Sequence, residues 1–268
     1  MDEMNDAEQP SAADVMAEVK RRQAARGERS RERSGGNRSA LVTAADRFIF
    51  WLSKHWLAVL NTLAFLYAGL PFLAPVLMHV RAPGAASLIY TLYRPLCHQL
   101  PQRSWFLFGP QLTYRLPELM ELAGDVVTGP FSNSFIGNEA LGYKVAFCQR
   151  DTAIYGAIFV FGLLFAVLRR RWHVRPLTWW AYILLGLVPM GFDGGYQLLS
   201  YALPLVFPNI SLQPYETTPL MRVLTGALFG WATVWLAYPY VQESMDDVRG
   251  SLQRRMLGMR HTRGWVDA

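Results

Sequence analysis

Long apolar runs, separated by pieces rich in arginine, are the feature that most constrains how this chain can fold. Four segments, at about 56–80, 152–168, 177–199 and 220–241, have the length and apolarity to cross a bilayer, which takes roughly 20 residues. Within hydrocarbon every backbone polar group must be hydrogen-bonded inside the protein, so such segments cross as α-helices. The sequence therefore predicts an all-α membrane protein with about four transmembrane helices.

The composition divides the chain into a polar tail, a membrane domain and a second tail. Hydrophobic residues make up 52% of the chain and charged residues only 17%, whereas a soluble domain carries about 25% charged residues. Residues 1–45 have few large apolar side chains, so we expect this tail to be disordered or weakly helical. The transmembrane domain then covers residues 46–241, and residues 242–268 form the second tail.

The cations predict which way the helices cross. The connection 169–175 contains four arginines and no acid, whereas the connection 201–219 contains no Lys or Arg and one acid, Glu216. Cytoplasmic loops carry the excess of Lys and Arg. The sequence therefore predicts a multi-pass protein of the plasma (inner) membrane, with both termini and the connection 169–175 in the cytoplasm.

With this orientation, the long connection 81–151 faces outward. The apolar stretch 85–96 is too short to cross the bilayer, so it predicts an interfacial or re-entrant helix. Residues 110–144 contain several glycines, prolines and asparagines that favour turns. We expect them to form an outer cap that rests on the helix ends.

Most of the side chains that could bind a ligand or take part in a reaction lie at one predicted depth in the membrane. Asp193 lies sixteen residues after Leu177, or roughly 24 Å along a helix, which places it near the outer boundary of the hydrocarbon. The predicted outer ends of the second and fourth spans are at the same level. The sequence therefore predicts a polar pocket there, with these ligand-binding candidates: Arg103, Arg150, Asp151, Tyr155, Asp193 and Arg222.

An acid within a span needs a partner, because an ionisable group there normally faces an opposite charge or a cavity. Arg150, Arg103 and Arg222 are the candidate partners of Asp193. We favour Arg150, since a planar guanidinium matches a carboxylate. The pair would either orient Arg150 toward a ligand or serve only to fix the rotation of the helix.

The two cysteines, Cys97 and Cys148, leave three alternatives open. An oxidising location outside the membrane favours a disulfide between them. Cys97, His98, Cys148 and Asp151 are also acceptable zinc ligands, although adjacent Cys and His rarely bind the same ion. Free reactive thiols are the third alternative, because nearby arginines would favour the thiolate. Zinc is thus the one cofactor that the sequence suggests.

The residues around both cysteines resemble an uncharacterised family of integral membrane proteins, domain of unknown function 2085. The pattern is Cys97-His98-Gln99-x-Pro101-x-Arg103-Ser104, Gly109, Cys148-x-Arg150 and Ile154-Tyr155-Gly156. The resemblance implies a prokaryotic origin and a multi-span fold, and it implies no particular activity. Relatives carry a second cysteine where this chain has Asp151, and their connection between the motifs is shorter.

Two functions fit the sequence. In the first, the outer pocket binds an anionic ligand, small or lipid-linked, or a metal. In the second, the protein is a non-enzymatic subunit or assembly factor of a larger membrane complex. The sequence contains no glycine-rich phosphate loop, His-Glu-x-x-His motif or nucleophile elbow, so it leaves open whether the protein is an enzyme. We expect membrane lipids and a membrane protein as partners, and no nucleic acid.

Overall fold

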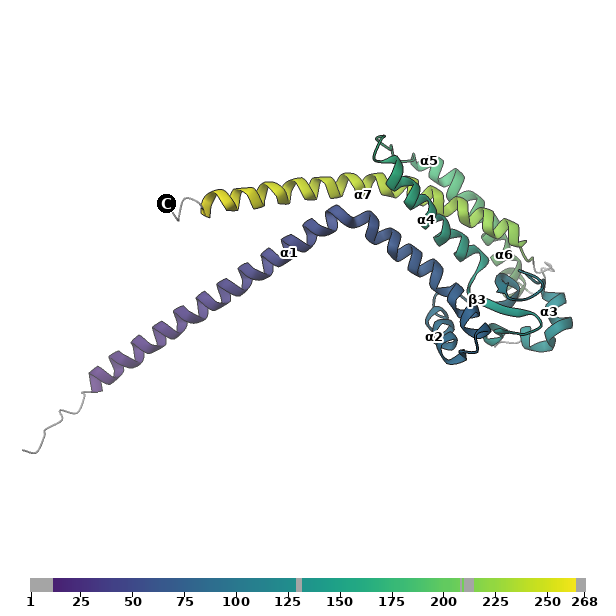
Figure 1. Ribbon diagram of the computed structural model, residues 1–268, viewed down its shortest axis with the longest axis horizontal. Helices are drawn as coiled ribbons and strands as arrows, with labels where there is room; N and C mark the ends of the chain where they lie inside the picture. Colours follow the sequence, from purple (N-terminus) through teal and green to yellow (C-terminus); the bar gives the residue numbers. More distant parts are fainter. Residues whose placement is uncertain (1–11, 129–131, 208, 210–214, 264–268) are drawn as a thin grey trace, which may run out of the picture. The chain divides into compact units, whose positions relative to one another are not determined.

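The computed structural model describes residues 12–128, 132–207, 209 and 215–263. The chain divides into two units, one of Met1–Lys54 with Val248–Ala268 and one of His55–Asp247. The second unit contains every candidate site residue. Helices dominate both units (Figure 1), in this order: α1 (Ala12–His79), α2 (Pro83–Tyr93), α3 (Leu116–Ala123), α4 (Gln149–Leu168), α5 (Trp179–Tyr182), α6 (Val188–Val206) and α7 (Pro219–Arg263).

The first unit is helical wherever the structure describes it. The tail for which the sequence indicates disorder or weak helicity forms the first part of α1, from Ala12 onward. Its Ala, Glu and Arg residues are strong intrinsic helix formers. Residues 1–11 of the predicted tail, and 264–268 at the other end, lie outside the described residues.

Three helices in the described part of the chain are long and apolar enough to cross a membrane. They occur within Ala44–His79, Gln149–Leu168 and Pro219–Arg254, and they contain the predicted spans 56–80, 152–168 and 220–241 almost entirely. The chain is therefore a helical membrane protein. The predicted span 177–199 is not among the three, so the count of four remains a prediction.

The segment predicted as the remaining span is helical but irregular. It consists of α5, a π-helical turn at Ile183–Leu187 and α6. Asp193 and Gln197 make it more polar than the other three helices. Both polar side chains are largely buried within the protein, which is the usual position of such groups in membrane helices.

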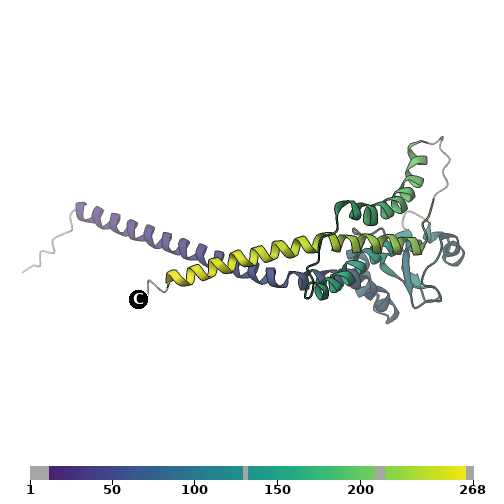
Figure 2. The ribbon, with the colours of Figure 1, turned by 90° about the horizontal axis from the view of Figure 1, so that it is seen from above.

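Helices α4 and α7 run side by side in the same direction (Figures 1 and 2). At their starts Arg222 Nη1 lies 3.2 Å from Gln149 Oε1, and at the far end of α4 Arg169 Nη1 lies 2.5 Å from Gln242 Oε1. The chain must therefore return along their length between Leu168 and Pro219. The α5–α6 segment makes this return.

Small residues allow α4 and α7 to pack closely. A Cβ atom at Gly226 would lie 2.8 Å from the Arg150 carbonyl oxygen, and one at Gly230 would lie 2.4 Å from the Ile154 carbonyl oxygen. Two glycines one turn apart are typical of close helix packing in membranes. This contact fixes the separation of the two helix starts, where Arg150 and Arg222 are located.

The connection 81–151 contains a small sheet, so the all-α prediction needs correction. Strands β1 (Ser104–Leu107), β2 (Gly137–Asn138) and β3 (Gly142–Cys148) pair antiparallel in the order β1-β3-β2. Aromatic and β-branched residues such as Trp105, Val145 and Phe147 favour strands. The short helix predicted within 85–96 is present as α2, whose buried face packs against β3.

The predicted cap, residues 110–144, forms a core of its own around β1. Its helix α3 contributes Leu119, which is fully buried with Phe106 of β1 and Tyr114. Tyr114 also donates a hydrogen bond to the Leu141 carbonyl oxygen at 2.9 Å. Cap residues 129–131 lie outside the described residues.

The α4–α7 contact generates a stability prediction. Gly230→Ala should destabilise the protein by about 1–3 kcal/mol, because the added methyl group has no space and the helices must separate. The matched control is Gly156→Ala on α4, where an added Cβ meets no atom within 4 Å. Thermal unfolding of the purified protein in mild detergent measures both variants. Equal melting temperatures for the two variants would contradict the packing described here.

Candidate functional site

The sheet brings the two cysteine motifs together. In the antiparallel pairing of β1 with β3, Ser104 lies opposite Cys148. Gln149, the first residue of α4, is fully buried and donates a hydrogen bond to the Ser104 carbonyl oxygen at 3.0 Å. The segment between α2 and β1, with Cys97 and Arg103, is thereby held beside the start of α4.

A buried lysine anchors this segment. Lys144 of β3 is fully buried, and its Nζ donates hydrogen bonds of 2.7 Å to the carbonyl oxygens of Gln99 and Asn133. Burial lowers the pKa of Lys144 to about 7, since it disfavours the charged form. Sequence reasoning missed this residue. The available signal was a lone lysine inside an apolar, strand-like stretch.

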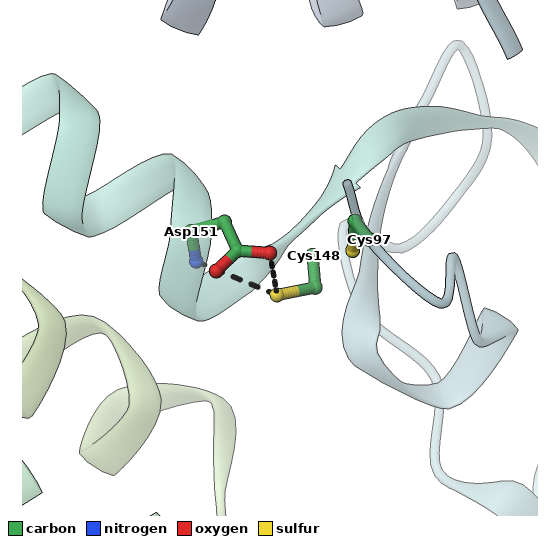
Figure 3. Close-up of side chains that lie close together, drawn as sticks. All are labelled: Cys97, Cys148 and Asp151. Carbon is green, nitrogen blue, oxygen red and sulfur yellow. Dashed lines mark hydrogen bonds between the residues drawn. The ribbon is translucent and has the colours of Figure 1, made fainter. Parts of the chain in front are cut away.

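Cys97, Cys148 and Asp151 converge at the start of α4 (Figure 3). Their sulfur and carboxylate oxygen atoms all lie within 4.8 Å of one another. Cys148 is the N-cap of α4, and its thiol donates a hydrogen bond to Asp151 Oδ2 at 3.0 Å. Cys97 lies across from them, on the segment that follows α2, and is buried.

The structure corrects two expectations about these cysteines. Both are free thiols, so the predicted disulfide between Cys97 and Cys148 is not formed. The Cys148 sulfur is instead engaged with Asp151. His98, one of the four predicted metal ligands, is exposed and is not part of the converging group, because its neighbour Cys97 takes the inward position.

The two thiols influence each other. The neighbouring thiol of Cys148 lowers the pKa of Cys97, in spite of burial. The same contact, together with burial and the negative charge of Asp151, raises the pKa of Cys148 strongly. Cys97 is therefore the thiol that ionises first.

Arg150 pairs with Asp193, as the sequence favours. Arg150 Nη2 lies 2.5 Å from Asp193 Oδ2, and the two side chains are only 18% and 9% exposed. Thr225 of α7 contributes a further, longer hydrogen bond of 3.4 Å to the same oxygen. Gly194 leaves space for the guanidinium, because a Cβ there would lie 2.8 Å from Arg150 Nη1.

Arg103 and Arg222 pair with Glu216 and not with Asp193. Arg103 donates two hydrogen bonds to this carboxylate, at 2.7 and 3.2 Å, and Arg222 donates one at 2.5 Å. Gln197 and Tyr201 of α6 each donate one more, both at 2.9 Å. Sequence reasoning noted Glu216 only as a lone acid in a cation-free connection. The absence of a nearby opposite charge was the missed signal.

The five donors affect the protonation of Glu216. Burial by itself favours the neutral acid, but the hydrogen bonds and positive charge of Arg103, with help from Tyr201 and Arg222, outweigh it and lower the pKa of Glu216. A carboxylate that accepts several hydrogen bonds is stabilised in its charged form. Glu216 thus stays ionised and joins α6, α7 and the Arg103 segment.

These residues surround a cavity of about 310 Å³. Of the predicted ligand-binding residues, Arg103, Arg150, Asp151 and Arg222 line it, together with Cys97, His98 and Cys148. Tyr155 does not line it but packs edge-on against Tyr67, with ring centroids 4.5 Å apart. Asp193 and Glu216 are not lining residues either, although both pair with arginines that are.

The fold and the site define a class: a helical membrane protein with a charged cavity where α4 and α7 begin. Residues 132–236 match the family described as predicted membrane protein (DUF2085). That range contains Cys148, Arg150 and Asp193, so the match confirms the family resemblance predicted from the motifs.

A sequence relative of the chain is likewise uncharacterised. An uncharacterized protein of the archaeon Methanocaldococcus jannaschii is 23% identical over 193 residues, which cover 70% of this chain and 93% of that protein. No solved structure matches the chain significantly. The similarity therefore extends over most of the chain without supplying an activity.

The Glu216 cluster generates the second prediction. Glu216→Gln should destabilise the protein at neutral pH by about 1–3 kcal/mol, because two guanidinium groups lose their charged acceptor. The folded-state pKa of Glu216 is lowered, so its contribution is present above the ordinary pKa of a glutamic acid and is lost as the pH falls through the lowered value.

Melting temperatures of wild type and Glu216→Gln, measured from pH 7 downward, test this prediction. The two curves should converge as the acidic limit is approached. Glu139→Gln, which alters an exposed cap acid, is the control and should leave the curve unchanged. A constant difference between wild type and Glu216→Gln at all pH values would contradict the role of the charge.

Proposed function

We propose that the cavity binds a small oxyanion, either free or carried by a lipid head group. The observation that carries the proposal is the position of the charges. Arg103, Arg150 and Arg222 are lining residues of the cavity, whereas their partners Asp193 and Glu216 are not. Such an arrangement holds the arginines in place while leaving positive charge on the wall.

The lining residues include three arginines and one acid, Asp151, while Asp193 and Glu216 pair with these arginines without being lining residues themselves. Helix starts add positive charge: α4 begins at Gln149 and α7 at Pro219, beside the lining residues Arg150 and Arg222. The N-terminus of a helix carries a partial positive charge and favours anions. In addition, Arg150 Nε is buried without a hydrogen-bond partner among the described residues.

The volume limits the ligand. About 310 Å³ is at the lower end of the range of small-molecule sites, which runs from about 300 to 1,000 Å³. It far exceeds the roughly 30 Å³ that one water occupies in the liquid. A phosphate, a small organic acid or the head group of an anionic lipid fits this space.

We place the cavity at the extracytoplasmic face of the plasma membrane. Two arguments support this location. The arginine-rich connection 169–175 lies at the opposite end of α4 from the cavity, and arginine-rich connections are cytoplasmic. The parallel course of α4 and α7 supports a return crossing by the segment between them, and a chain with four spans would have both termini in the cytoplasm.

In the alternative function, the protein is a subunit or assembly factor of a larger membrane complex, and the same charges have a structural role. In that case the ion pairs only fix the helix rotations, and partner proteins cover the outer surface. Purification in mild detergent separates the two proposals. A stoichiometric partner protein and no anion binding would favour the alternative.

Arginine variants test the anion site. Arg150→Ala should weaken binding about 10- to 150-fold, the effect of losing a hydrogen bond to a charged group worth about 1.5–3 kcal/mol. Asp193→Ala should weaken it in the same direction, because Arg150 loses the carboxylate that orients it. Arg170→Ala is the matched control, since it removes an exposed arginine far along α4 from the cavity.

Two probes distinguish the source of the oxyanion. Inorganic phosphate is titrated by calorimetry into the detergent-purified protein, and phosphatidylglycerol retained on the protein is measured by native mass spectrometry. Phosphate binding points to a free anion, and retention of phosphatidylglycerol without phosphate binding points to a lipid head group. Failure of both probes with wild-type protein, or equal binding by wild type and Arg150→Ala, would overturn the proposal.

A further inference from the structure

One group in the cavity wall consists of two thiols and a carboxylate and contains no positive charge. Cys97, Cys148 and Asp151 come from two segments about fifty residues apart in the sequence, yet their potential ligand atoms lie within 4.8 Å of one another (Figure 3). In a tetrahedral zinc site such atoms are about 3.5–3.8 Å apart, given metal–ligand distances of about 2.0–2.3 Å. Side-chain rotations that move these atoms by about an ångström would therefore allow all three atoms to bind one ion.

The donors are suited to a thiophilic metal. Two thiolates and one carboxylate are acceptable ligands of Zn²⁺, whereas the harder cations Mg²⁺ and Ca²⁺ prefer oxygen ligands throughout. The thiol of Cys148 already donates its proton toward Asp151. A metal ion would replace this shared proton and bind the sulfur and the carboxylate together.

The surrounding charges favour the deprotonated ligands. Cys148 is the N-cap of α4 and Asp151 lies in its first turn, where the helix dipole stabilises negative charge. Arg150 and Arg222 line the same cavity and supply positive charge nearby. Two thiolates, a carboxylate and a divalent ion together carry one net negative charge, which these neighbours offset.

We infer that Cys97, Cys148 and Asp151 form a binding site for a divalent thiophilic metal ion, with Zn²⁺ as its chemical type. On binding, both cysteines release their protons to solvent and form metal–sulfur bonds. Three protein ligands leave the fourth tetrahedral position open toward the cavity. That position is where an oxyanion held by the arginines, or a water molecule, would meet the metal.

Zinc alone tests the inference, with no anion present. The full-length protein is purified in mild detergent, reduced, treated with a chelator and then titrated with ZnCl₂ against a chromophoric competitor. Wild type should bind one ion per chain. Cys97→Ser, Cys148→Ser and Asp151→Asn should each weaken binding about 100-fold or more, since each removes one of three protein ligands.

Matched controls alter residues of the same types elsewhere. Asp125→Asn in the cap and His173→Ala in the connection after α4 both change exposed groups, and both should keep wild-type affinity. Thiol alkylation provides a second readout that does not depend on affinity in the variants: zinc should protect both cysteines of wild type from alkylation. Wild-type melting temperature should rise with zinc, and that of Cys148→Ser should not.

Several results would overturn the inference. They are failure of the reduced wild type to bind zinc, unprotected thiols in the presence of zinc, and unchanged affinity in all three ligand variants. The result is separate from the anion proposal. Loss of zinc binding with intact phosphate binding refutes only the metal site, and the reverse refutes only the anion site.

Discussion

The structure depends on the pairing of buried guanidinium groups at the starts of α4 and α7. Arg150 and Arg222 are largely buried, and leaving a buried charge without its partner destabilises the folded protein. Asp193 on α6 and Glu216 before α7 supply the negative charge. These two contacts fix the rotation and depth of α6, hold the Arg103 segment against the helices, and so determine the shape of the cavity.

Sequence reasoning succeeded where a local physical rule applied. Apolar length located the three membrane helices, and the cost of an acid within a span predicted the pairing of Asp193 with Arg150. Sequence reasoning failed where the two residues of an ion pair are far apart in the sequence and no local pattern connects them. Glu216 lies more than a hundred residues from Arg103 in the sequence, and its cation-free connection does not indicate which arginines it pairs with.

The sheet shows the same limit. Strands β1 and β3 are short and separated by the cap, so their apolar residues resemble an interfacial helix or a membrane-facing loop until their register is known. Tertiary pairing then decides the structure. The pairing of Ser104 with Cys148 is what brings the two cysteine motifs together and places Lys144 under the Gln99 segment. Neither the thiol–carboxylate group nor the buried lysine follows from spacing alone.

The residues at the start of α4 contribute to both proposed binding sites. Within four consecutive residues it presents a thiol, a buried amide, a guanidinium and a carboxylate: Cys148, Gln149, Arg150 and Asp151. The first and last face Cys97, and the middle two connect to α6 and α7. One helix turn therefore joins the proposed metal site to the proposed anion site.

The most direct test of the central claim, a charged cavity on the outer side of the membrane, is the sidedness of labelling in intact cells. In a background with Cys97→Ser and Cys148→Ser, single cysteines are introduced by Asp125→Cys in the cap and by His173→Cys in the arginine-rich connection; both positions are exposed. The account predicts that a membrane-impermeant maleimide labels the first variant from outside and the second only after permeabilisation. The reverse pattern would place the cavity in the cytoplasm and contradict the account.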